Sequence, residues 1–427
     1  MSKFEYIRAE DFDRAWLNFE YDLPLEPLPD GSRNPFYVER PGNAIAQLED
    51  ELLRPYYSPP KIFFSGHRGC GKSTELRRLA VHPEILAKYY PIHFTIREEA
   101  DINNLDFKDV LLAIGGRIYR DYKARDGKLP VQLEKELDRW RGKLMEEVTR
   151  VDRLAGFEVQ GGLDMFFATT SLKMKLEPAT RHVIRQVIER DVRGLIQVID
   201  DITAAMLAKE KRMPIVLIDD LDKPDLSTGR EIFYEHRETM LQPNCAIVYT
   251  VSSSLFYSGE MIEIRQRAPS VFLPNIKLHP RGRNQEKDKK GYETMREFVR
   301  RRMNLDLISP KALDEAVRLG GGVFGETARV MRSAIQRAYR QKRITMEHVR
   351  SVEKEIRGEY RRILTAEQRA LMKDIHATNR LDDPEKVAPL LQFLAVLEYA
   401  NGDTWCDVHP ALVTLLEEDE NAGAQTA

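Results

Sequence analysis

The sequence of 427 residues predicts an α/β fold in which a parallel sheet lies between layers of helices. Three observations lead to this prediction. A glycine-rich stretch, SGHRGCGKST, directly follows the short apolar run KIFF and precedes a helical pattern. The apolar run Ile215–Ile218 ends in two aspartates, and a further apolar run, AIVYTV, follows about thirty residues later. Continuous apolar runs of this kind are typical of parallel strands that helices cover on both faces.

The bulk composition narrows the class of protein. The chain is too long for one ordinary core, so we expect two or three domains. No apolar stretch approaches the roughly 18–20 residues that cross a bilayer, and the charged N-terminus lacks the apolar core of a signal peptide. The cysteines are three, widely spaced, and show no disulfide or zinc pattern: Cys70, Cys245 and Cys406. These features predict a cytoplasmic protein with no membrane partner.

The glycine-rich stretch matches the pattern G-x-x-x-x-G-K-[ST] of a phosphate-binding loop. Small residues let backbone N–H groups surround phosphate oxygens, and the dipole of the following helix favours the same anion. We predict that Lys72 reaches the β- and γ-phosphates of ATP and that the Ser73 hydroxyl ligates Mg²⁺. The alternative is a glycine-rich turn that matches by chance. The predicted nucleotide-binding residues of the loop are Gly66, His67, Arg68, Gly69, Cys70, Gly71, Lys72, Ser73 and Thr74.

The aspartates that end the run MPIVLIDDLDK provide the second element that such a site needs. Ligands of open α/β sheets bind at the carboxyl ends of the strands, where these side chains are expected to lie. We assign Asp219 to the Mg²⁺ shell, and Asp220 to orienting or deprotonating the attacking water. A buried strand that merely ends in a solvated acidic turn is the alternative.

Two further features fit the same site less specifically. The run AIVYTV ends in Ser252 and Ser253, which could touch the γ-phosphate or the water, or could form an ordinary serine turn. Farther along, a Gly320-Gly321-Gly322 turn opens a helical pattern that carries Arg329 and Arg332. An arginine there could swing onto the nucleotide, or could face solvent on a basic helix.

Together these motifs resemble the AAA+ and STAND branch of P-loop ATPases, over about residues 34–364. The resemblance rests on NPFYVERPGNAIAQLEDELL ahead of the loop, Walker A at 66–73, Walker B at 215–220, and a helical lid with the glycine turn. It implies ATP hydrolysis with Lys72, Asp220 and the sensor-like Ser252 as catalytic residues. It also implies base contacts from Phe36, Tyr37 and Val38, although an aromatic cluster is also typical of a core. Arg329 is an approximate match to a lid arginine, because Gly325 occupies the usual position.

The pattern along the chain predicts the following organisation. An N-terminal arm (1–33) precedes a P-loop core (34–280), which carries an insert (124–212) between the two motifs. Within this insert, alternation in GFEVQGGLDMFFATTSLKMKLE (156–177) predicts a β-hairpin, and an amphipathic helix follows over 180–209. Such an insert recognises a partner or merely enlarges the fold. A helical lid (281–364), a small α+β module (365–416) and an acidic flexible tail (417–427) complete the chain.

The small α+β module resembles a winged-helix domain, with helices at 366–377 and 384–396 and a hairpin around Asn401-Gly402-Asp403. Trp405 is interpreted as the core anchor of that hairpin. Between Arg281 and Leu364 there are 22 Lys and Arg residues against 12 Asp and Glu, whereas from Thr365 onward there are 4 against 12. The acidic module would repel nucleic-acid phosphates, which favours a protein-docking role for it.

Two functions follow from these predictions. The first is a nucleotide-dependent switch whose Asp-Asp strand end suits slow hydrolysis. It would promote self-association or activate a separate protein effector, with a setting in bacterial stress or anti-phage systems suggested by the resemblance. The second is a DNA-associated AAA+ ATPase of the origin-binding or transposition-helper kind, which the basic lid favours. A compact P-loop kinase of small molecules is disfavoured because it needs neither this lid nor the trailing module.

Overall fold

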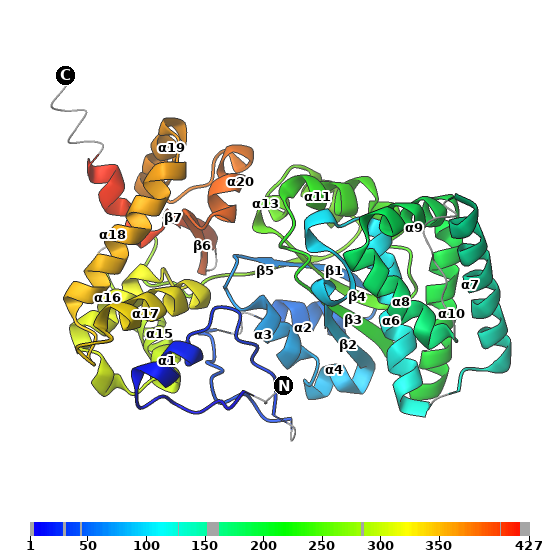
Figure 1. Ribbon diagram of the computed structural model, residues 1–427. Coiled ribbons are helices and arrows are strands. Elements are labelled where there is room, and N and C mark those ends of the chain that lie inside the picture. The colour runs from blue at the N-terminus through cyan, green and yellow to red at the C-terminus, as the bar shows by residue number, and fades with distance from the viewer. Residues whose placement is uncertain are drawn as a thin grey trace.

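The computed structural model describes residues 4–28, 31–42, 45–126, 128–151, 162–282, 286–401 and 403–418. Its centre is a parallel sheet of five strands in the order β2-β3-β4-β1-β5 (Figure 1). The strands are β1 (Lys61–Gly66), β2 (Tyr89–Thr95), β3 (Met213–Asp219), β4 (Ala246–Val251) and β5 (Ser270–Leu273). The predicted fold class, an α/β P-loop core followed by a helical lid and a small α+β unit, is therefore confirmed.

The strands bury both faces of the sheet because successive side chains point in opposite directions. On β3, Val216 and Ile218 belong to one hydrophobic cluster, whereas Ile215 and Leu217 belong to another on the opposite face. The second face is covered by α2 (Ala46–Leu53), α3 (Lys72–Leu79) and α4 (Pro83–Lys88). The continuous apolar runs of the sequence are explained by this two-sided burial.

The first face carries a thicker helical layer. The helices α6 (Phe107–Asp126) and α10 (Val192–Glu210) pack against each other and against β3. Outside them lie α7 (Val131–Val151), α8 (Leu163–Leu176) and α9 (Pro178–Arg190) (Figure 1). The predicted helix over 180–209 is two helices, which divide at Asp191, the N-cap of α10. Only part of the predicted insert is therefore an addition to the core, because α10 packs directly on the sheet.

The predicted β-hairpin over 156–177 is wrong wherever the structure describes it. Residues 152–161 lie outside the described part, and the rest of the segment is the helix α8. Phe167 contacts the ring of Tyr119 on α6, and Phe166 contacts the ring of Trp140 on α7. Packing against these helices favours a helical period over the alternation of the sequence. The buried side chains of α8 follow that period: Leu163, Phe166, Phe167, Thr170 and Met174.

Shorter helices connect the strands of the core. They are α5 (Ile96–Glu99), α11 (Leu226–Arg230), α12 (Arg237–Met240), α13 (Ser253–Phe256) and α14 (Glu260–Arg265). Among them, α13 directly follows β4 and contacts the C-terminal part of the chain through α20. The core therefore meets the C-terminal part at the carboxyl edge of its sheet.

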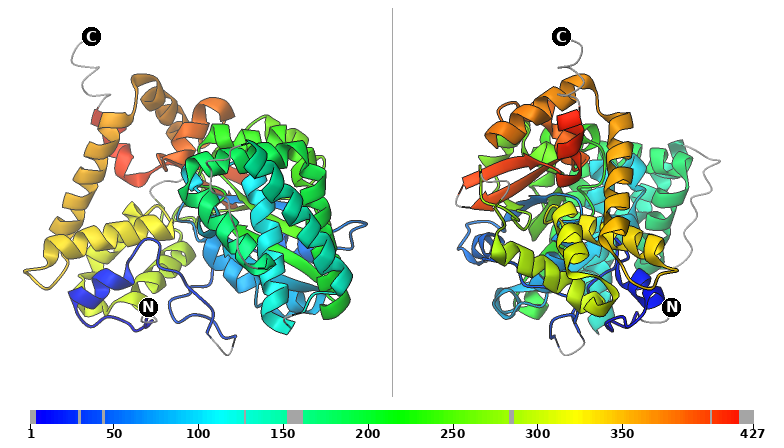
Figure 2. Two further views of the ribbon diagram at one scale, coloured as in Figure 1. Left: turned by 45° about the vertical axis from the view of Figure 1, so that its right-hand side comes forward. Right: turned by 90° about the vertical axis from the view of Figure 1, so that its left-hand side faces the viewer.

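The lid consists of α15 (Lys289–Arg302), α16 (Pro310–Leu319), α17 (Phe324–Ala338) and α18 (Met346–Ile363). The N-terminal helix α1 (Phe12–Asn18) packs on α17 and so belongs to this part of the molecule (Figure 2). Residues 9–18 of the predicted N-terminal arm therefore pack on the lid, where the Ala9 N–H donates to the carbonyl of Arg302 at 3.0 Å.

The C-terminal unit contains α19 (Ala366–Thr378), α20 (Pro384–Gln392) and the antiparallel strands β6 (Val396–Asn401) and β7 (Asp403–Val408). The helix α20 ends before the predicted residue 396 because Leu394 adopts a left-handed backbone (φ 62°) that turns the chain into β6. Trp405 is buried and lies 4.6 Å from the ring of Tyr399, as expected of a core anchor.

The lid and the C-terminal unit share one hydrophobic cluster. The predicted domain boundaries and the winged-helix assignment stay predictions. Of the predicted acidic tail, residues 417 and 418 are helical, and Glu418 forms ion pairs with Arg357 and Arg361. Residues 419–427 lie outside the described part.

We expect that Gly322→Ala unfolds the protein at much lower denaturant concentration than the wild type. Gly322 has φ 74°, and a Cβ there would lie 1.7 Å from the carbonyl oxygen of Ile276. The left-handed backbone and the collision together are expected to cost at least ~3 kcal/mol of unfolding free energy. Urea unfolding measures this loss.

The matched control for this substitution is Gly358→Ala on α18. A Cβ at Gly358 meets no atom within 4 Å among the described residues. Alanine in a helix interior is more favourable than glycine by about 1 kcal/mol, so this variant should be slightly more stable. Equal unfolding midpoints for the two variants would contradict the role assigned to the glycine turn.

Candidate functional site

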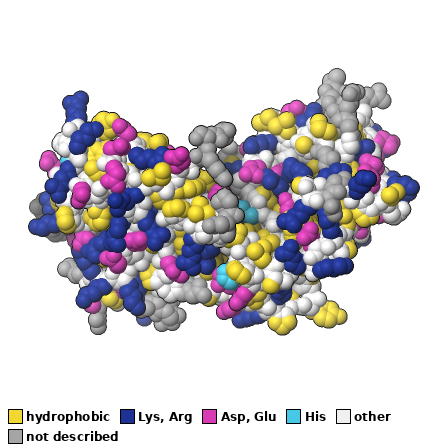
Figure 3. Space-filling model, turned by 90° about the horizontal axis from the view of Figure 1, so that it is seen from below, with side chains coloured by type: hydrophobic (Ala, Val, Ile, Leu, Met, Phe, Trp, Pro, Cys, Tyr) yellow, Lys and Arg dark blue, Asp and Glu magenta, His cyan; other side chains and the backbone are white. Residues whose placement is uncertain are grey.

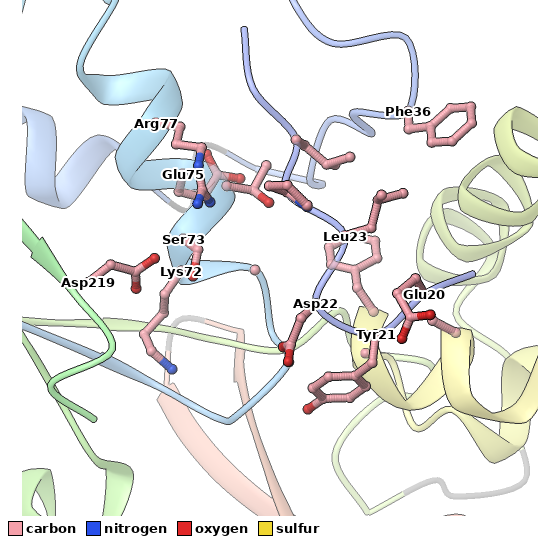
Figure 4. A pocket seen from close by; sticks show the side chains of 18 of the residues that line it. Glu20, Tyr21, Asp22, Leu23, Phe36, Lys72, Ser73, Glu75, Arg77 and Asp219 are labelled. Atoms are coloured by element: carbon pink, nitrogen blue, oxygen red, sulfur yellow. The ribbon is translucent and has the colours of Figure 1, made fainter. Parts of the chain in front are cut away.

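A deep cleft opens where the carboxyl edge of the sheet meets the lid. It encloses about 1310 Å³, counting the part open to solvent, and its walls come from the core, the lid and the N-terminal segment. The side chains shown in Figure 4 converge from these three parts of the chain. Of the predicted nucleotide-binding residues, those that line the cleft are Tyr37, Gly69, Gly71, Lys72, Ser73 and Thr74.

The phosphate loop joins β1 to α3, as the sequence predicts. Gly71 is the N-cap of α3 with φ 108°, a conformation that side chains rarely adopt, so glycine is required there. The other predicted residues of the phosphate loop do not line the cleft. Cys70 is packed in the core, His67 is fully buried, and Arg68 is exposed.

Lys72 lies at the centre of the loop and is buried. Its Nζ donates to the carbonyls of Gly66 at 2.7 Å and His67 at 3.1 Å, and forms an ion pair with Asp222 at 2.8 Å. Burial opposes the charge of Lys72, but the carboxylate of Asp222 outweighs it and raises the pKa of the ammonium group. The Lys72 charge in turn lowers the pKa of the buried Asp222 carboxyl. The pair is therefore ionised, and Asp222 was missed although it follows the predicted acidic pair by two residues.

Asp219 and Ser73 face each other across the cleft wall, from β3 and α3 (Figure 4). Burial, and then the neighbouring charges of Asp220 and Asp222, raise the pKa of the Asp219 carboxyl, although the nearby Ser73 hydroxyl opposes this shift. A hydroxyl and a carboxylate beside a phosphate loop form the oxygen donor set that Mg²⁺ takes together with nucleotide phosphates. These residues fit the predicted metal.

Asp220 lines the cleft with a left-handed backbone, φ 65°. Its Oδ2 accepts a hydrogen bond from the Thr95 hydroxyl at 2.7 Å and lies 3.3 Å from Nε of Arg97. Thr95 ends the edge strand β2, and Arg97 lies in α5, which directly follows that strand. Sequence reasoning missed them because no motif marks the end of β2.

The segment before β1 forms the wall nearest the lid. Phe36, Tyr37 and Val38 are buried and line the cleft, and their contact with a base stays a prediction. Arg302 of α15 donates to the Phe36 carbonyl at 3.1 Å. Arg40, which sequence reasoning missed, donates to the carbonyls of Cys70 and Pro274 and lies 5.2 Å from the ring of Phe324. This segment therefore connects the phosphate loop with the lid.

Outside the phosphate loop, two further predicted residues do not line the cleft. The hydroxyl of Ser252 accepts from the Leu255 N–H as the N-cap of α13, so Ser252 follows the alternative of a serine turn. Arg329 points away, toward Glu326 at 3.3 Å and Glu359 at 3.6 Å. On α17 the face toward the cleft consists instead of Phe324, Gly325 and Ala328.

The phosphate loop also contacts the lid and the C-terminal unit. The Gly325 N–H of the lid donates to the Gly69 carbonyl at 2.9 Å. The Glu398 N–H of β6 donates to Nε2 of His67 at 2.9 Å. Burial, and then the charge of Lys72, lower the pKa of His67 to about 3, so its ring is neutral and can accept this hydrogen bond. Lid and C-terminal unit are thus in direct hydrogen-bond contact with the phosphate loop.

Glu398 is expected to make the stability of the folded protein depend on pH. Burial raises the pKa of its carboxyl to about 8, although the Tyr257 hydroxyl and Arg265 oppose the shift. Between about pH 4.5 and 8 the folded chain therefore holds a proton that the unfolded chain releases, and stability falls as pH rises through this range. We expect Glu398→Gln to reduce the fall in melting temperature between pH 5.5 and 8.5. Parallel curves for the two proteins would show that Glu398 ionises normally.

No protein-family model matches this sequence, and no curated protein does. Solved structures of similar arrangement include the Orc1 protein of Aeropyrum pernix in complex with DNA, at 14% identity and a TM-score of 0.41, covering 99% of this chain and 100% of that chain. Cdc6p from Pyrobaculum aerophilum is 12% identical, with a TM-score of 0.38, covering 90% and 98%. C. elegans PCH-2 is 12% identical, with a TM-score of 0.28, covering 72% and 63%. At these scores the similarities support no inference about function.

In the part of the chain that the structure describes, no helix combines the length and the apolar character that a bilayer crossing requires.

Proposed function

We propose that this protein binds ATP with Mg²⁺, hydrolyses it slowly, and acts as a switch of the AAA+ or STAND kind. The observation that supports this proposal is the convergence of Lys72, Ser73 and Asp219 on one cleft that the lid also lines. A phosphate loop and an acidic strand end in this relation are the two parts that P-loop hydrolysis needs.

Each residue then has a role that its position supports. Lys72 neutralises the β- and γ-phosphates, for which it must exchange or share its ion pair with Asp222. Ser73 and Asp219 hold Mg²⁺, which neutralises phosphate charge when it is bound. Asp220 orients or deprotonates the attacking water. Tyr37 and its neighbours contact the base.

The contacts of the phosphate loop support coupling between the nucleotide and the rest of the molecule. Gly69 contacts the lid through Gly325, and His67 contacts the C-terminal unit through Glu398. The Tyr399 hydroxyl also donates to the Gly321 carbonyl at 2.8 Å, which connects the C-terminal unit with the glycine turn of the lid. A change in the loop on nucleotide exchange would reach both parts, and through them a second copy or a separate protein effector.

The switch is tested by the solution mass of Asp220→Asn, measured by light scattering without nucleotide, with ADP, and with ATP and Mg²⁺. A discrete larger species that forms with ATP alone supports a switch that assembles. A monomer in all three states would contradict self-assembly and leave activation of a separate partner as the output.

A DNA-associated ATPase is the alternative, and the basic lid is the observation that favours it. Lys and Arg side chains are interspersed with Asp and Glu on the face in Figure 3. Several lid arginines are ion-paired, among them Arg296 with Asp314, Arg318 with Glu353, and Arg337 with Glu355. ATPase activity that duplex DNA stimulates, with a steep loss as salt rises, would favour this alternative over the first proposal.

A further inference from the structure

The segment Glu20–Leu25, here called the N-terminal strap, spans the cleft from the lid to the core. At its lid end, Glu20 forms an ion pair with Arg332 of α17 at 2.5 Å. Just beyond its other end, Glu26 accepts from Nε of Arg77 on α3 at 2.8 Å. The strap is therefore fixed on both sides of the cleft, and all six of its residues line it (Figure 4).

The strap has an inner and an outer face. Tyr21, Leu23 and Leu25 are half-buried, whereas the residues between them, Asp22 and Pro24, are exposed. Tyr21 and Asp22 form a turn, in which the Leu23 N–H donates to the Glu20 carbonyl at 3.3 Å, and after this turn Leu23 and Leu25 are less exposed than Pro24 between them. The two leucines of the inner face keep accessible apolar surface toward the cleft, which a nucleobase or sugar would cover with a gain in free energy.

Tyr21 sits between the phosphate loop and the lid. A Cβ added at Gly69 would lie 2.7 Å from the Tyr21 hydroxyl, and one added at Gly325 would lie 2.7 Å from its ring. The phenol thus fills the space above both glycines. The loop amides around Gly69 are those that surround nucleotide phosphates.

The Tyr21 hydroxyl is available as a hydrogen-bond donor. Burial, and then the nearby charge of Glu326, raise the pKa of the phenol to about 12, so it keeps its proton at neutral pH. Among the residues that the structure describes, the Tyr21 hydroxyl has no hydrogen-bond partner.

We propose that the N-terminal strap is a working part of the nucleotide site. The O–H of Tyr21 donates a hydrogen bond to the nucleotide phosphates, and Leu23 and Leu25 cover the base and sugar. This inference rests on the proposed function, because it assigns residues to the same site. It places the segment that follows α1, the helix that packs on α17 of the lid, in direct contact with the bound nucleotide.

The experiment compares the affinity of the full-length wild type, Tyr21→Phe and Tyr56→Phe for ADP with Mg²⁺ by titration calorimetry. Tyr21→Phe keeps the ring and removes the donor, so we expect affinity to fall about tenfold or more, as for other hydrogen bonds to charged groups. Tyr56→Phe is the matched control, because the Tyr56 hydroxyl donates to Glu51 outside the cleft. Melting temperatures without nucleotide confirm that each variant is folded.

Hydrogen exchange of the wild type tests the strap without any substitution. Addition of ADP with Mg²⁺ should slow exchange in the peptide that spans residues 20–25. Equal affinities of the two tyrosine variants, or unchanged exchange in the strap while the wild type binds ADP, would overturn this inference and leave the proposed function standing. A folded wild type that binds no nucleotide would overturn both.

Discussion

Lys72→Ala is expected to weaken nucleotide binding by about 100-fold or more. The Lys72 ammonium is buried at the centre of the phosphate loop and ionised. Hydrogen bonds to charged groups contribute about 1.5–3 kcal/mol each, and Lys72 is expected to contact two phosphates. Titration calorimetry with ATPγS and Mg²⁺ measures the loss.

The ion pair with Asp222 requires a control for this experiment. Removing Lys72 alone leaves a buried carboxylate without its partner, which destabilises a fold by about 3–5 kcal/mol. The double variant Lys72→Ala/Asp222→Asn removes that charge and should fold, yet still bind nucleotide about 100-fold or more weakly than the wild type. Asp222→Asn alone should bind at least as tightly as the wild type, because Lys72 is then free for the phosphates. Normal affinity in the double variant would contradict the role assigned to Lys72.

Asp220→Asn is expected to keep nucleotide affinity within about threefold while ATP turnover falls. The predicted Mg²⁺ ligands Ser73 and Asp219 remain, whereas the group assigned to the water is lost. General-base catalysis contributes about 10²–10⁴-fold, so the rate of phosphate release should fall by that factor. Phosphate release under saturating ATP and Mg²⁺ measures it.

Asp225→Asn is the matched control for this variant. Asp225 is an exposed carboxylate five residues farther along, and it caps α11 by accepting from the Thr228 N–H. Asparagine caps helices as well as aspartate does, so stability and turnover should stay at wild-type values. Wild-type turnover in Asp220→Asn would show that another group activates the water.

The parts of the site that could be predicted from the sequence are those encoded within a few adjacent residues. The phosphate loop and Asp219 are contiguous motifs whose strand and helix context is also local. Ser252 and Arg329 were placed at the site by their position in the chain alone. Their side-chain directions depend on other contacts, a helix cap for Ser252 and the carboxylates of Glu326 and Glu359 for Arg329.

The N-terminal strap and the helix α8 could not be predicted for a different reason. The stretch YDLPLEPLPDGS, to which most of the strap belongs, is rich in acidic residues and proline, which is typical of a linker. The place of the strap at the cleft depends on α1 packing on α17, some 300 residues away. In α8 the alternation of the sequence suggested strands, but burial against α6 and α7 gives the segment a helical period. Long-range packing decides both cases.

Every residue role assigned to the cleft requires that it bind a nucleoside triphosphate with Mg²⁺. A calorimetric titration of the folded wild-type chain with ATPγS, in the presence of Mg²⁺ and again with EDTA, tests this binding directly. We expect one nucleotide per chain, with tighter binding in Mg²⁺ than in EDTA, and an affinity about 100-fold or more weaker in Lys72→Ala/Asp222→Asn. Absence of binding to the wild type at millimolar nucleotide would contradict it.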